Sequence, residues 1–140
     1  MGKLLIKTSN PIVFSGSTPI EETDWKEYID SSGKVIGIYV DVDTKAAGFK
    51  STPKYLASLG GVSWHWAYIG TTSIYSPTKT GFRVYLMNSP DTPLPTPAIA
   101  KEKKWHVNWL GVENFYNVGS TPIDNTDWKE YLDSSGKHIG

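Results

Sequence analysis

Apolar and polar residues alternate along three stretches of the chain, the period-two pattern that predicts half-buried β-strands. These stretches are residues 35–43, 81–87 and 105–112. In each stretch the apolar side chains fall on one face, so each predicted strand has one face available to bury. With Leu59 from a further segment, the predicted core consists of Ile38, Val40, Leu59, Phe82, Val84, Leu86, Val107 and Trp109.

A fourth stretch, residues 62–69, alternates in the same way, with Val62, Trp64, Trp66 and Tyr68 on one side. We expect a strand here, following a turn at Gly60 and Gly61. Two interpretations of its tryptophans stay open. In the first, they belong to a buried strand face and His65 is the exposed alternation partner. In the second, the indole faces are exposed and stack on a sugar ring.

Shorter signals complete the predicted elements. Strands are expected at residues 4–7 and 12–14, a single helical turn at residues 23–28 with Thr23 or Asp24 as its N-cap, and a turn at residues 30–34 with Gly33 at positive φ. Pro53 confines the 49–59 segment to a strand edge or a strand start. Residues 89–97 contain four prolines and predict a stiff loop.

Short strands, tight turns and little helix are typical of all-β proteins. We therefore predict an antiparallel β-sandwich of about six to eight strands.

The chain also repeats itself. Residues 16–37 and 119–140 are identical at 18 of 22 positions, with a constant offset of 103 residues. This period is the size of a small domain rather than of a solenoid repeat. We expect an N-terminal strand segment (1–15), one repeat unit (16–118) and the start of a second, truncated repeat (119–140). Val35 is replaced by His138, which indicates a partly solvated position.

The repeated segment carries two aromatic side chains, Trp25 and Tyr28, whose copies are Trp128 and Tyr131. Aromatic side chains are enriched in the cores of protein interfaces, so these four residues are candidates for a contact between neighbouring modules. The alternative is that they fasten the N-terminal segment onto its own sandwich. The pattern alone favours neither.

Charge and composition exclude several functions. Fourteen basic and fourteen acidic residues give no net charge, which is untypical of a nucleic-acid-binding domain. The cluster of Lys101, Lys103 and Lys104 is interpreted as a solvated loop. No apolar run is long enough for a membrane span, and no cysteine is present for thiol chemistry or disulfides.

We expect no enzyme and no bound metal or cofactor. The three histidines, His65, His106 and His138, stand in no known catalytic motif. Asp41 and Asp43 share the polar face of the 35–43 strand, but their spacing lacks the calcium-loop pattern. We interpret that pair as a solvated outer face.

Three segments, taken in order, resemble the H-type lectin family (the agglutinin and discoidin C-terminal type). Phe49 to Leu59 is similar to F-x-x-x-P-x-V-x-x-x-x-x-L, Ser76 to Phe82 precedes a strand, and Trp105 to Tyr116 is similar to the closing strand W-x-x-x-W-I-x-I-E-N-Y. The resemblance covers roughly residues 25–116.

This resemblance implies a six-stranded antiparallel sandwich of about 100 residues. It implies sugar binding without catalysis, often of galactose or N-acetylgalactosamine, usually by a trimer with sites in loops near protomer interfaces. Family members often carry a Trp-His pair just past the Gly-Phe strand. Here that stretch reads Met87-Asn88-Ser89-Pro90.

Two functions follow as hypotheses. The first is a carbohydrate-binding adhesion module, repeated in tandem and located outside the cell or at its surface. Its candidate ligand-binding residues are Trp64, His65, Tyr85, Asn88 and His106. The second is a structural subunit of an extracellular filament or surface layer, assembled head to tail through the repeated segment.

Overall fold

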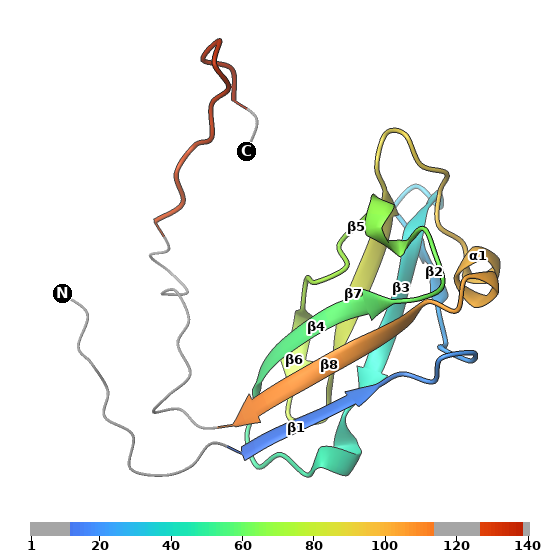
Figure 1. Cartoon of the computed structure of the whole chain (residues 1–140), viewed down its shortest axis with the longest axis vertical. Coiled ribbons are helices and arrows are strands. Elements are labelled where there is room, and N and C mark those ends of the chain that lie inside the picture. The colour runs from blue at the N-terminus through green and yellow to red at the C-terminus, as the bar shows by residue number, and fades with distance from the viewer. Residues whose placement is uncertain (1–11, 114–126, 139–140) are drawn as a thin grey trace.

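The computed structural model describes residues 12–113 and 127–138. Within them, eight strands form two antiparallel sheets, as predicted for an all-β sandwich. The three-stranded sheet has the order β1 (Ile12–Ser17), β8 (His106–Glu113) and β4 (Lys54–Gly60). The five-stranded sheet has the order β2 (Lys26–Ile29), β3 (Val35–Asp43), β7 (Gly81–Asn88) and β5 (Tyr68–Ile69), with β6 (Tyr75–Thr78) also paired to β7. Figure 1 shows the two sheets as facing layers.

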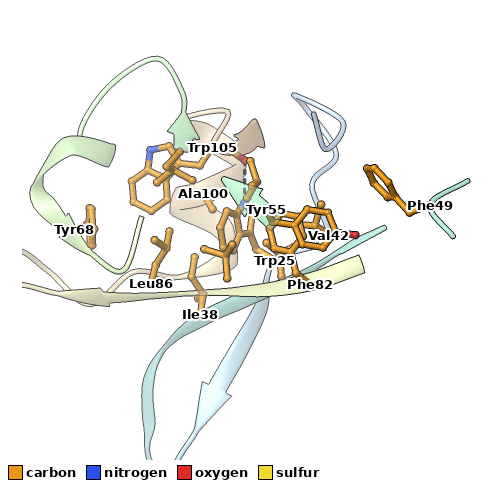
Figure 2. Packing of buried hydrophobic residues seen from close by; sticks show 14 residues of the cluster. Trp25, Ile38, Val42, Phe49, Tyr55, Tyr68, Phe82, Leu86, Ala100 and Trp105 are labelled. Carbon is orange, nitrogen blue, oxygen red and sulfur yellow. Dashed lines mark hydrogen bonds between the residues drawn. The ribbon is translucent and has the colours of Figure 1, made fainter. Parts of the chain in front are cut away.

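The core lies between the sheets and is built from the alternating faces predicted for β3, β7 and β8. The buried side chains of these three strands are Ile38, Val40, Val42, Phe82, Val84, Leu86 and Val107. Leu59 of β4 is buried as expected, and Trp109 is half-buried and packs against the same cluster. Figure 2 shows how Trp25, Tyr55 and Trp105 fill the space between the layers.

The prediction of a helical turn at residues 23–28 is wrong. Residues 23–25 are irregular and β2 begins at Lys26, pairing with β3 opposite Tyr39. The Trp25 indole is buried and its Nε1 donates a hydrogen bond to the backbone oxygen of Trp105, at 2.9 Å (Figure 2). This long-range contact and the β2–β3 ladder outweigh the local capping signal. Trp25 therefore fastens its segment onto its own sandwich.

The strand predicted at residues 62–69 is also wrong. The chain bends after Gly60, forms the 3₁₀ helix η2 (His65–Ala67), and only Tyr68 and Ile69 are extended, as β5. Tyr68 is buried, whereas Val62, Trp64 and Trp66 are exposed. The interpretation of the two tryptophans as a buried strand face is therefore incorrect.

A short helix was missing from the prediction. Pro97, expected in the proline-rich loop, is the first residue of α1 (Pro97–Glu102), and Lys101 of the basic cluster is in the same helix. The Thr96 hydroxyl accepts a hydrogen bond from the backbone N–H of Ile99, at 3.2 Å, so Thr96 is the N-cap. Ala100 is fully buried, which makes α1 part of the core.

Several local predictions are confirmed. β1 covers the predicted 12–14 strand, β4 starts directly after Pro53, and Gly33 has φ 87° in the turn that follows β2. Val35 is half-buried, which agrees with its replacement by His138. A second 3₁₀ helix, η1 (Lys45–Ala47), follows β3. The strand predicted at residues 4–7 lies outside the described residues.

No helix in the described part of the chain has the length and apolar content needed to cross a membrane.

Candidate functional site

Two exposed tryptophans and a proline-containing turn enclose a mainly apolar hollow of about 330 Å³. Trp66 is 83% exposed and Trp64 is 48% exposed, which is unusual for the largest apolar side chains. We call this site the tryptophan hollow; its principal lining residues are Trp64, Trp66, Tyr68, Asp91, Thr92 and Pro93. Asp91 and Thr92 supply a carboxylate and a hydroxyl beside the apolar surfaces.

The first wall of the hollow is held against the start of β8. The backbone N–H of Val62 donates to the oxygen of Lys103 at 2.8 Å, and the indole Nε1 of Trp105 donates to the oxygen of Ser63 at 2.9 Å. A methyl group on Gly61 would lie 2.6 Å from Cδ1 of Trp105, so this approach requires a glycine. The fully buried Trp105 thus sets the position of the loop that carries the exposed tryptophans.

Trp64 occupies a strained backbone conformation. Its φ is 70°, in the left-handed region that a bulky residue rarely adopts, and it precedes η2 as the N-cap residue without a side-chain cap. Such conformations cost on the order of 1–3 kcal/mol and cluster at functional sites. The Nζ atom of Lys103 lies 5.0 Å from the centre of the Trp64 ring, a cation–π contact that orients the indole.

The second wall is the turn Ser89–Thr92. The Thr92 N–H donates to the Ser89 oxygen at 3.1 Å, and the Ser89 N–H donates to the Thr92 Oγ1 at 2.8 Å. Pro90 stands at the second position of the turn, where its fixed φ is favourable. The Asn88 amide donates to the oxygens of Ser89 and Thr92, at 3.2 and 3.3 Å. Because Asn88 also pairs with Tyr68 across β5 and β7, the two walls are joined at this point.

Two buried polar atoms beside the hollow lack a hydrogen-bond partner among the described residues: Nδ1 of His65 and the hydroxyl of Tyr68. Burial raises the pKa of the Tyr68 hydroxyl, so the group stays protonated and can donate a hydrogen bond. Unpaired buried polar groups are uncommon in folded proteins and often coincide with a function. Both residues belong to the segment that forms the first wall.

The structure brings together only part of the predicted site. Trp64 lines the hollow, and His65 and Asn88 adjoin it without lining it. His106 lies opposite Gly60 on the three-stranded sheet, where its Nδ1 is 2.8 Å from the Lys104 oxygen, and Tyr85 belongs to a separate cluster.

The predicted ligand-binding set omitted Trp66 and Tyr68, and sequence reasoning missed altogether Asp91, Thr92 and Pro93. The signal that would have revealed them is Ser-Pro-Asp-Thr itself, since serine followed by proline is typical of a type I turn.

Tyr85 is the centre of a tyrosine cluster on the outer face of the five-stranded sheet. Its ring lies 4.7 Å from that of Tyr28, 5.8 Å from that of Tyr39 and 4.9 Å from that of Tyr75. The guanidinium of Arg83 stands 4.1 Å from the centre of the Tyr39 ring. Tyr28, predicted as an interface residue, therefore packs on the surface of its own sandwich.

Arg83 forms a two-pronged ion pair with Asp41 beside this cluster. Its Nε and Nη2 atoms donate to the two carboxylate oxygens of Asp41, at 2.6 and 2.8 Å. Asp41 and Asp43 face outward from β3, as predicted. In the described residues no group of three metal-ligating side chains comes together, and both oxygens of Asp41 are engaged by the arginine.

This ion pair predicts a dependence of stability on pH. The hydrogen bond from Arg83 lowers the pKa of Asp41, so the pair stabilises the fold above about pH 4, the unfolded value, and is lost as the pH falls through the folded value. Asp41→Asn should therefore flatten the loss of stability below about pH 4, measured by urea unfolding. At pH 7 its cost should stay below about 1 kcal/mol because the pair is solvent-exposed. An unchanged acid slope would contradict this assignment.

Comparisons with protein-family models, with curated proteins and with solved structures find no match to this chain.

Proposed function

We propose that this chain is a carbohydrate-binding module that binds a sugar ring at the tryptophan hollow. The observation that carries the proposal is the pair of exposed indoles, Trp64 and Trp66, facing a space that also contains Asp91 and Thr92. The C–H groups of a sugar ring pack on aromatic faces, and its hydroxyls bond to a carboxylate and a hydroxyl. A mainly apolar hollow with a few polar groups is the usual form of a small-molecule binding site.

The size and sequence context specify the ligand further. About 330 Å³ is near the lower limit for ligand sites, which suits one terminal sugar rather than a long chain. The similarity of residues 25–116 to H-type lectins supports galactose or N-acetylgalactosamine as the first sugars to test. The proposed setting is adhesion outside the cell or at its surface. A repeated module would raise weak affinity through multivalency.

A glycan array compares the chain with its Trp66→Ala variant. We expect binding to a limited set of terminal sugars, and a loss of at least about tenfold in the variant, which corresponds to about 1.4 kcal/mol. Trp66 is exposed, so the variant should fold normally. Tyr85→Phe, in the separate tyrosine cluster on the outer face of the five-stranded sheet, is the matched control and should bind as before. Absence of binding across the array, or equal binding by Trp66→Ala, would refute the proposal.

Head-to-tail assembly is the second candidate, and one observation favours it. Trp128 is 86% exposed, whereas its counterpart Trp25 is 6% exposed. In this proposal the second copy of one chain packs against a neighbouring chain. Sedimentation at increasing concentration should then show open-ended growth that Trp128→Ala abolishes. A single closed species, such as the trimer usual in H-type lectins, would argue against it.

A further inference from the structure

The sandwich contains a defined binding position for the repeated segment. Trp25 is inserted between the layers and donates its indole proton to the Trp105 oxygen, and the next residues form β2 along the edge of β3. Lys26 pairs with Tyr39, and Tyr28 pairs with Gly37. Any segment with this sequence and access to this edge can make the same contacts.

The second copy carries the same side chains. Residues 126–131 are identical to residues 23–28. Among the described residues of this copy, Trp128, Tyr131 and Leu132 are all exposed. Because the buried and the exposed indole are chemically identical, the second can take the place of the first with little net change in buried apolar area.

The second copy already has the local conformation of the first. Asp133 Oδ1 accepts hydrogen bonds from the N–H of Ser135 at 2.8 Å and of Lys137 at 3.0 Å. In the first copy, Asp30 Oδ1 accepts the equivalent bonds from Ser32 at 2.8 Å and Lys34 at 3.1 Å. Gly33 and Gly136 have φ values of 87° and 80°. A preformed turn lowers the entropy lost when the second copy docks.

The chain is long enough for the second copy to reach this position. Ile12, at the start of β1, lies directly opposite Glu113, at the end of β8. Trp25 follows Ile12 by 13 residues, and Trp128 follows Glu113 by 15. The tether of the second copy is therefore two residues longer than that of the first. Exchange within one chain is also favoured over exchange between chains by its effective concentration, which is in the millimolar range for short tethers.

We propose that residues 127–132 replace residues 24–29 in the same sandwich, with Trp128 in the position of Trp25. This inference goes beyond sugar binding and does not depend on it. The first copy is the main occupant, because its turn continues directly into β3. The exchanged form is a minor state in which the first copy is released. The repeat thereby gives one sandwich two alternative edge segments.

The absence of cysteine allows a clean disulfide test. In the exchanged form Lys129 stands opposite Tyr39, and cross-strand positions of this kind satisfy disulfide geometry. The full chain with Lys129→Cys and Tyr39→Cys is incubated in a glutathione redox buffer and followed on non-reducing gels. The positive control is Lys26→Cys with Tyr39→Cys, directly paired in the structure. The negative control is Glu130→Cys with Tyr39→Cys, one residue out of register on the same tether.

We expect the variant with Lys129→Cys and Tyr39→Cys to form its disulfide within one chain at least tenfold faster than the variant with Glu130→Cys and Tyr39→Cys. Closure at equal rates overturns the proposal. Closure only between chains also overturns it and supports head-to-tail assembly instead.

A second measurement uses stability rather than trapping. Trp128→Ala alone should leave the urea midpoint unchanged, because Trp128 is exposed in the main form. In the Trp25→Ala background, Trp128→Ala should lower the midpoint further, because the second indole is then the remaining occupant of the position. Equal midpoints for Trp25→Ala and the double variant contradict the exchange.

Discussion

Replacing Trp105 with alanine is expected to lower the free energy of unfolding by about 3–5 kcal/mol, the range for removing a buried aromatic side chain. Trp105 is 1% exposed and packs edge-on against Tyr68, with ring centres 4.7 Å apart. Its indole also donates the hydrogen bond to Ser63 that holds the first wall of the tryptophan hollow. The substitution therefore removes core volume and releases the binding loop at once.

Such a loss is a large fraction of the 5–15 kcal/mol typical of a domain, so the melting temperature should fall by more than about 10 °C. Urea and thermal unfolding followed by circular dichroism measure the effect. Trp66→Ala makes the same chemical change on the surface and should stay within about 0.5 kcal/mol of the wild type. If the two variants were equally stable, Trp105 would not be the centre of the core.

Substituting Gly61 with alanine should cost about 1–3 kcal/mol, because the added methyl group has no free space. It would lie 2.6 Å from Cδ1 of Trp105, 3.0 Å from the Lys103 oxygen and 3.3 Å from Nδ1 of His65. Relief requires the loop to move away from β8, which breaks the Val62 and Ser63 hydrogen bonds. We therefore expect weaker ligand binding together with the loss of stability.

The matched control for Gly61→Ala is Val62→Ala, at the neighbouring exposed position. That variant should change the free energy of unfolding by less than about 0.5 kcal/mol. Near-ultraviolet circular dichroism adds a specific readout, since displacement of the loop changes the surroundings of the Trp64 and Trp105 indoles. A Gly61→Ala protein with wild-type stability and an unchanged aromatic spectrum would show that the loop tolerates a side chain here.

Strands with one buried face were predictable from sequence. β3 and β7 alternate strictly, and Ile38, Val84 and Leu86 are the fully buried residues that the pattern indicates. In the β3–β7 ladder, Ile38 lies directly opposite Leu86, so the buried faces of the two strands coincide. The local pattern and the long-range pairing therefore agree. Elements whose local pattern agrees with the global fold in this way can be predicted from a single sequence.

The loop at residues 62–67 shows where this reasoning fails. Its apolar–polar alternation is the same as in a strand, but two hydrogen bonds from the α1–β8 corner decide its conformation. The partners in these hydrogen bonds, Lys103 and Trp105, lie some forty residues further along the chain. A local sequence pattern therefore cannot indicate them. The same holds for Trp25, whose bond to the Trp105 oxygen spans 80 residues. The helix α1 was missed for a different reason, because Thr96 and Pro97 form an N-cap and first-turn pair that the proline-rich composition of the segment obscured.

The candidate site was predictable only in part for the same reason. Trp64 was predicted from the Trp-His-Trp segment that follows the turn at Gly60 and Gly61, although the alternation allowed a buried strand face as well. The opposite wall comes from the turn Ser89–Thr92, which the pairing of Tyr68 with Asn88 brings alongside. Without that register no sequence argument places Asp91 near Trp66.

Sugar binding at the tryptophan hollow is tested most directly by nuclear magnetic resonance of the six indole N–H groups in a titration with N-acetylgalactosamine and galactose. We expect saturable shifts of the Trp64 and Trp66 signals, with the buried Trp25 and Trp105 signals nearly unchanged. Shifts at other indoles while Trp64 and Trp66 stay constant, or no shifts with any sugar identified on the array, would contradict binding at this site.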